Sequence, residues 1–133
     1  MFCAYRSAAS TYNQVRVDSG VAGARPIDLV VMVYEGAIEA LARAAASLQA
    51  GDIGAKNVAV TRAIRIIDEG LKAPLDMRAG EIAANLGELY DYMTRRLLQG
   101  SARNDVLMLE EVRDLLLDLK GAWNEIAVRG APG

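Results

Sequence analysis

Apolar residues recur at steps of three and four through most of this chain, and that spacing limits what the chain can fold into. Such residues lie on one face of an α-helix, whereas a half-buried strand alternates at every second position. The clearest stretch begins at Pro26, a residue favoured at the first position of a helix. Its apolar residues step by four and three throughout: Ile27, Val31, Tyr34, Ile38, Leu41, Ala45 and Leu48. The pattern predicts a long packed helix.

Three further segments show the same spacing, each bounded by residues that start or stop helices. The second helix is expected from about Asp52 to Ala73, the third from near Gly80, and the fourth after Gly100, with Asn104 or Asp105 as its cap. The residues expected to face inward are Val60, Ile64, Ile67 and Leu71 in the second helix, Ile82, Leu86, Leu89, Met93 and Leu97 in the third, and Leu109, Val112, Leu116, Leu119, Trp123 and Ile126 in the fourth.

Short connections between long helices make sequence neighbours antiparallel. The predicted fold is therefore all-α, an antiparallel up-down four-helix bundle over residues 26–128 with a short N-terminal helical arm. Residues 1–25 are expected to form this arm and a flexible linker, and residues 129–133 a disordered tail. The composition agrees, because 53% of the residues are hydrophobic and only 5% are aromatic. A core of aliphatic residues and alanine suits closely packed helices.

Several classes of function are disfavoured by the composition. The chain has no histidine, which excludes histidine-ligated metals and catalysis that depends on a histidine base. Its formal net charge of −2 lacks the basic footprint of a nucleic-acid binder. No stretch approaches the roughly twenty apolar residues that cross a membrane, so direct membrane insertion is not expected. A single cysteine and no signal peptide favour a cytoplasmic protein.

An enzyme remains the alternative function. A helical mutase of the chorismate type can work with Arg and Glu residues alone, and five arginines are candidates to hold a dicarboxylate: Arg62, Arg65, Arg95, Arg96 and Arg103. Their spacing shows no clamp, and the inward stripes carry essentially no polar groups that converge in a pocket. We therefore expect no catalytic residues, no cofactor and no metal, and regard the small mutase-like enzyme as the weaker reading.

The first long helix has more apolar surface than one contact face requires. Beside its inward stripe lies a second row: Val30, Val33, Ala37, Ala40 and Ala44. A helix that is apolar over most of its circumference must be covered on more than one side. Either further bundle helices cover this row, or it forms a shallow, alanine-walled groove that accepts a helix from a partner. The sequence alone leaves both open.

The N-terminal arm is a candidate to cover such a groove. Tyr5 and Tyr12 are seven residues apart and would share one face of a short helix, joined to the bundle through a linker that contains Gly20 and Gly23. We expect the arm to cap the groove in the free protein and to leave it when a partner binds. A permanently packed arm or a disordered tail is the alternative.

Residues 80–97, GEIAANLGELYDYMTRRL, resemble the signature helix of the FliS family of flagellar export chaperones, which reads approximately G-x-I-A-x-N-L-x-x-L-Y-D-Y-M-x-x-R-L. Residues 34–38, YEGAI, are similar to the family's L-Y-[DE]-G-A-I, and Leu75-Asp76 to its S-L-D. One departure is Arg25, which stands where the family usually has serine or a similar capping residue.

The resemblance implies a cytoplasmic export chaperone without catalytic activity or cofactor. Such a protein would bind the disordered C-terminal segment of flagellin, prevent its premature polymerisation, and assist its delivery to the export gate of the flagellar type III secretion apparatus. The signature also adds residues of the third helix to the candidate partner-binding set, which is then Tyr5, Tyr12, Val30, Val33, Ala37, Ala40, Asn85, Tyr90 and Tyr92.

Overall fold

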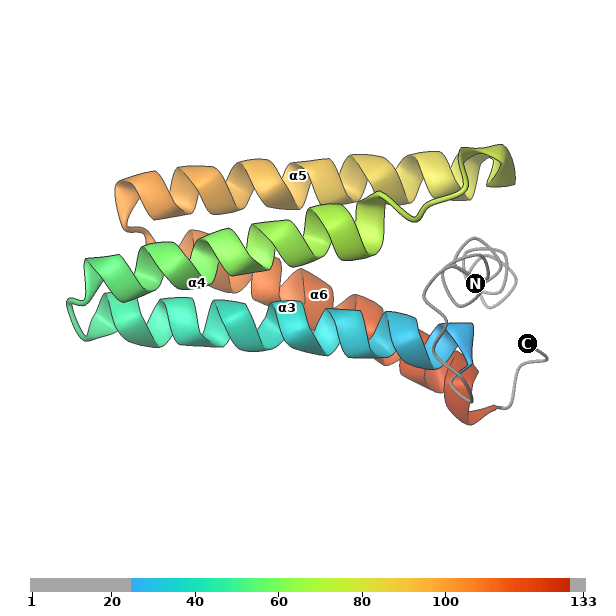
Figure 1. The fold of residues 1–133 in the computed structure, drawn as a ribbon, viewed down its shortest axis with the longest axis horizontal. Helices are drawn as coiled ribbons and strands as arrows, with labels where there is room; N and C mark the ends of the chain where they lie inside the picture. Colours follow the sequence, from blue (N-terminus) through green and yellow to red (C-terminus); the bar gives the residue numbers. More distant parts are fainter. Residues whose placement is uncertain (1–24, 130–133) are drawn as a thin grey trace.

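The computed structural model describes residues 25–129 and confirms an all-α helical bundle. Its elements are α3 (Pro26–Gln49), α4 (Ile53–Arg65), the π-helical segment η1 (Ile66–Lys72), the 3-10 turn η2 (Met77–Ala79), α5 (Glu81–Arg103) and α6 (Val106–Val128). Long helices run up and down, and each follows its sequence neighbour through a short connection (Figure 1). The expected arm with Tyr5 and Tyr12 and the last four residues lie outside the described part of the chain.

Local chemistry accounts for the helix boundaries. The side chain of Asp52 accepts a hydrogen bond from the backbone N–H of Ala55 at the start of α4, and the side chain of Asp105 accepts one from Leu107 at the start of α6. Such caps satisfy backbone N–H groups that have no partner within the helix. Asn104 instead ends α5 in the left-handed conformation, with φ of 51°. Of the two candidates, Asp105 is thus the cap of the last helix.

The departure at Arg25 has a structural role that a capping serine would not supply. Arg25 makes no side-chain cap at α3. Its guanidinium pairs with Asp28 at 2.9 Å, and it donates a hydrogen bond of 3.2 Å to the backbone carbonyl of Ala127. The residue therefore ties the first turn of α3 to the last turn of α6. The interaction with Asp28 raises the pKa of Arg25 and lowers that of the carboxyl.

The second helix is less regular than the sequence indicates. The expected helix to Ala73 changes from α to π geometry at Ile66, and a 3-10 turn follows before α5. Both Ile67 and Leu71 face the core from this widened stretch, as expected. Gly70 lies close against α3 here, since a Cβ on it would be 2.8 Å from Cγ1 of Val33. A side chain at this position would therefore require Val33 or the backbone around it to move.

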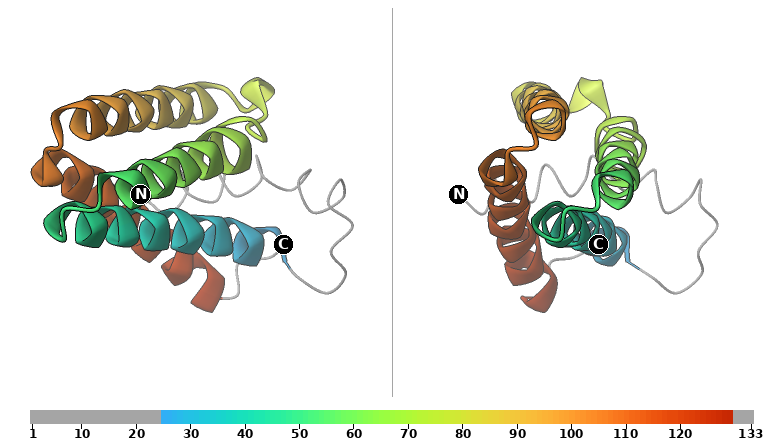
Figure 2. Two further views of the ribbon diagram at one scale, coloured as in Figure 1. Left: turned by 60° about the vertical axis from the view of Figure 1, so that its left-hand side comes forward. Right: turned by 90° about the vertical axis from the view of Figure 1, so that its left-hand side faces the viewer.

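Seen end-on, the bundle has α3 between α4 and α6, and α5 packs on α6 and on η1 (Figure 2). The hydroxyls of Tyr34 and Tyr90 are 2.6 Å apart, and both side chains are fully buried. This hydrogen bond joins α3 to α5 across the interior. The expected inward residues Ile27, Tyr34, Leu41 and Ala45 of α3 are all buried, which confirms that part of the prediction.

The buried stripe of α3 is nevertheless wider than predicted and turned toward the second row. Val31, Ile38 and Leu48 are only partly buried, although they pack against the core. The buried stripe of α5 also differs from the predicted one. Small residues of α5, Ala83 and Gly87, are buried where Ile82, Leu86 and Leu89 were expected, and those three are partly buried. Small side chains let two backbones approach closely, and the larger ones then pack around the contact.

Two helical glycines allow a test of this packing. A Cβ on Gly100 would lie 2.9 Å from Cβ of Met108, whereas a Cβ on Gly121 would have no neighbour within 4 Å. Alanine is favoured over glycine inside a helix by roughly 0.5–1 kcal/mol, and overpacking costs about 1–3 kcal/mol. We expect Gly121→Ala to raise the free energy of unfolding and Gly100→Ala to lower it by about 1 kcal/mol, as measured by urea denaturation. Equal stabilisation by both would contradict the close α5–α6 approach.

Candidate functional site

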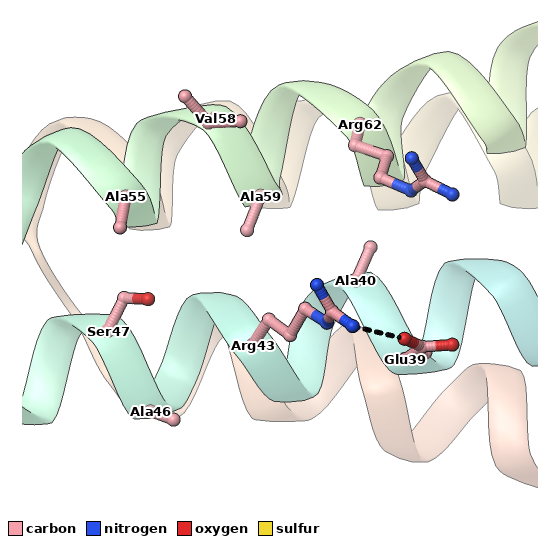
Figure 3. Close-up of a pocket in the computed structure, with 9 residues that line it drawn as sticks. All are labelled: Glu39, Ala40, Arg43, Ala46, Ser47, Ala55, Val58, Ala59 and Arg62. Atoms are coloured by element: carbon pink, nitrogen blue, oxygen red, sulfur yellow. Dashed lines mark ion pairs between the residues drawn. The ribbon is translucent and has the colours of Figure 1, made fainter.

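A shallow groove of about 710 Å³ lies between α3 and α4. Five residues of α3 and four of α4 line it, and Figure 3 shows them: Glu39, Ala40, Arg43, Ala46, Ser47, Ala55, Val58, Ala59 and Arg62. The two helices are consecutive and antiparallel, so their residues form two facing walls. The groove is open to solvent along its length, a shape that suits a segment of chain better than a small molecule.

Alanine accounts for the shape of the groove. Ala55 and Ala59 point from α4 toward α3, and Ala40 points from α3 toward α4 (Figure 3). Side chains this short do not fill the outer space between two packed helices. Ala40 and Ala59 are buried at 2% and 8% exposure and form the floor, whereas Val58 is 71% exposed on the α4 wall. Val58 thus adds exposed apolar area beside the alanine floor.

The charged groups of the groove sit on its rim. Arg43 pairs with Glu39 along α3 at 2.9 Å, and both side chains are largely exposed. Arg62 extends from α4 toward the gap between the helices (Figure 3). Within residues 25–129 it has no ion-pair partner. The groove therefore combines an apolar floor with a polar margin.

The second row on α3 lies largely inside the bundle. Val30, Ala37 and Ala40 are buried, and Val33 is partly buried against η1. Of the two coverings that the sequence left open, the structure has bundle helices, since α4 and α6 both pack against α3. Only Ala40 of this row lines the groove. Contact of the other three with a partner stays a prediction, and it would need the helices to move apart.

Of the three candidate partner-binding residues on α5, one is buried and two are exposed. Tyr90 is fully buried with its hydroxyl hydrogen-bonded to that of Tyr34, so its contact with a partner stays a prediction. Asn85 and Tyr92 lie on the exposed outer face of α5, as expected. Because α5 does not border the groove between α3 and α4, the structure does not bring these residues together with Ala40. Tyr5 and Tyr12 lie outside the described residues.

Tyr92 belongs to a polar cluster that links α5 to α6. Its hydroxyl donates to one carboxylate oxygen of Glu111, and the guanidinium of Arg96 donates to the other at 2.6 Å. The hydrogen bonds from Tyr92 and Arg96 hold the pKa of the Glu111 carboxyl below its usual value. The same contact raises the pKa of Tyr92. Asp91 has Arg95 four positions along α5, the spacing of a helical ion pair, but its partner is Lys72 of η1, at 2.6 Å.

Sequence reasoning missed the α4 wall of the groove. Ala55 and Ala59 were not singled out, and Val58 was not recognised as an exposed apolar residue. The available signal was the alanine at every fourth position of this helix, at 55, 59 and 63. That spacing places small residues on one side of a helix, but it does not say whether a neighbour fills the space beside them.

The arginines of the enzyme alternative do not form a clamp. Arg96 is held by Glu111, and Arg95 and Arg103 extend from α5, away from the groove that contains Arg62. In the part of the chain that the structure describes, no three acidic, cysteine or histidine side chains are placed to share a metal ion. None of the helices between residues 25 and 129 is long and apolar enough to span a membrane.

The groove residues Ala40 and Val58 give contrasting predictions for stability. A carboxylate at Ala40 would be buried without a partner, which is among the most destabilising changes known. We expect Ala40→Asp to lower the free energy of unfolding by about 3 kcal/mol or more. Val58→Asp puts the same charge on the surface and should change it by about 0.5 kcal/mol. Thermal melts followed by circular dichroism test this, and an Ala40→Asp protein as stable as the parent would show that the floor is open.

The Glu111 cluster predicts a dependence of stability on pH. Because the folded protein holds the pKa of Glu111 below its unfolded value, the stabilisation is present above the usual glutamate pKa of about 4.3 and is lost as the pH falls through the folded value. The gap in melting temperature between the parent and Glu111→Gln should therefore narrow from pH 7 to pH 3. A gap that stays constant over this range would mean that the cluster does not form in solution.

Comparison with known proteins agrees with this architecture. Residues 8–130 match the profile of the family described as "Flagellar protein FliS". The chain is 49% identical over 126 residues to the flagellar secretion chaperone FliS of Salmonella typhimurium. The aligned region covers 94% of this chain and 93% of that protein. The chain is 42% identical over 115 residues to the protein of the same name from Escherichia coli, covering 86% and 85%. The Bacillus subtilis relative is 37% identical over 102 residues, covering 77% and 75%.

The family profile extends over nearly the whole chain and includes every helix described above. A secretion chaperone is a binding protein and not a class of enzyme, which accords with a helical bundle that has an open groove with four alanines among its nine lining residues. The chain belongs to the FliS family of flagellar secretion chaperones, with a chaperone role in flagellar export.

Proposed function

We propose that this protein is a cytoplasmic export chaperone that binds the disordered C-terminal region of flagellin. Binding prevents premature polymerisation of the subunit, and the complex is delivered to the export gate of the flagellar type III secretion apparatus. Family membership supports the general role. The observation that carries the specific one is the alanine-lined groove between α3 and α4, with Val58 exposed beside it.

The dimensions of the groove suit one face of a helix. Its walls run from Glu39 to Ser47 on α3 and from Ala55 to Arg62 on α4, which is about 12 Å at 1.5 Å per residue. Two turns of an amphipathic helix can lay their large aliphatic side chains over so short a floor. A disordered flagellin segment would have to become ordered on binding, and this costs free energy. The remainder of the segment therefore needs further contacts along the bundle.

The same geometry argues for a non-catalytic role. Two arginines line the groove, Arg43 and Arg62, and Arg43 is already paired with Glu39. Both sit on the rim of an open surface, where water screens charges. Mutase chemistry would require convergent groups in a closed pocket that excludes water. The α3–α4 groove offers none of that enclosure, so we favour binding over catalysis.

Isothermal titration calorimetry with a C-terminal flagellin segment tests the proposal. We expect binding by the parent with a negative heat-capacity change, because apolar surface is removed from water. Val58→Asp should weaken the affinity by about tenfold, the cost of placing a charge against an apolar helix face being roughly 1–2 kcal/mol. Leu107→Asp is the matched control, since Leu107 is 72% exposed on α6 and does not line the groove.

The two possible failures have different meanings. If the parent binds no flagellin segment from any source tested, the proposed function is wrong. If the parent binds and both aspartate variants retain its affinity, flagellin binds elsewhere and the groove assignment is wrong.

A further inference from the structure

The outer face of α4 extends the groove beyond its rim. A second shallow hollow, of about 560 Å³, is lined by Asn57, Val58, Thr61, Arg62, Arg65 and Ile66. It shares Val58 and Arg62 with the groove between α3 and α4, so the two hollows adjoin. Val58 is therefore the apolar centre of a continuous surface, with Arg62 and Arg65 one and two turns farther along the same helix.

The charged residues that line this surface are mostly positive. The ionisable groups that line the two hollows are three arginines and one glutamate. Glu39 is paired with Arg43, whereas neither Arg62 nor Arg65 has an ion-pair partner among residues 25–129. The whole chain has a formal charge of −2, so this pair of cations is a local exception and not part of a generally basic surface. Both of these arginines belong to α4.

We propose that Arg62 and Arg65 select a partner helix that carries carboxylates along the edge facing α4. The inference rests on the proposed function, in which the occupant is the flagellin segment, and names the chemistry that the segment must present there. Arg62 and Arg65 are three residues apart and project on one side of α4. Two carboxylates three or four residues apart on an adjacent helix match that spacing, and guanidinium groups bind carboxylates with two parallel hydrogen bonds.

Arg62 and Arg65 affect which helix binds more than how tightly it binds. Exposed ion pairs contribute little each, whereas like charges placed together oppose binding. A helix with lysines along the α4 edge is therefore rejected, while one with glutamates is accepted. Apolar contact with Val58 and the alanine floor supplies attraction for both. The arginines then decide which apolar helices enter the groove and which way round they lie.

The test uses the full-length chain and three synthetic helical peptides. All three share one leucine-rich apolar face and differ only along the flanking edge, which carries Glu, Gln or Lys. Fluorescence anisotropy at low and at high salt measures each affinity. With the parent, we expect the Glu peptide to bind about tenfold more tightly than the Lys peptide, and the difference to shrink at high salt.

Charge reversal on the protein gives the decisive comparison. The double variant Arg62→Glu/Arg65→Glu should reverse the order of the Glu and Lys peptides. The control Arg95→Glu reverses an exposed arginine on α5 that has no ion-pair partner in the described chain and does not line either hollow, and it should keep the parent's order. Circular dichroism melts confirm that both variants fold.

The outcomes separate this inference from the proposed function. If Glu and Lys peptides bind the parent equally, or if the double variant keeps the parent's preference, the arginines do not select and the inference is overturned. If sedimentation shows that the double variant dissociates a dimer of the parent, the occupant is a second copy of the chain, and the inference is again overturned. The flagellin segment is measured alongside. Its failure to bind the parent overturns the proposed function whatever the synthetic peptides do.

Discussion

Contact of α3 with neighbours on two sides is the constraint on which the rest of the structure depends. The helix is packed by α4 along one side and by α6 along the other, and the residues between these contacts include Ala37, Ala40 and Ala44. Side chains of this size let both neighbours approach α3 at once. Bulkier residues there would push one of them away, since a close-packed interior tolerates little added volume.

The same small side chains create the groove. Inside the bundle, alanine allows the helices to pack closely and leaves little void. Among residues 25–129, no third helix lies at the outer edge of the α3–α4 contact, and Ala55 and Ala59 are too short to cover the space. The core and the candidate binding surface are thus two sides of one interface. This is why Ala40 belongs to both, and why a charge there should damage the fold before it affects binding.

Polar contacts attach α5 to the rest of the bundle. Lys56 is only 2% exposed, and its ammonium donates to the backbone carbonyl of Ser101 at 2.8 Å and to its hydroxyl at 3.1 Å. Near the middle of α5, Asp91 pairs with Lys72. The adjacent residue, Tyr90, makes the hydrogen bond between tyrosine hydroxyls in the core. A buried ammonium is tolerated only where oxygen atoms replace its water, so these contacts define how α5 is placed against α4.

Hydrophobic spacing and capping residues determined the helical class, the number of long helices in the described chain, their approximate ends and most of the inward residues, because these depend on contacts within a few positions. The tertiary structure decided which neighbour each helix face and each charged side chain contacts. Two apolar rows on α3 look alike in the sequence, and only the positions of α4 and α6 showed that the second row is buried. Asp91 had a possible partner one turn away, yet it pairs with Lys72. The groove exists because no other helix of the described residues covers one edge of the α3–α4 interface, and local periodicity carries no information about a missing neighbour.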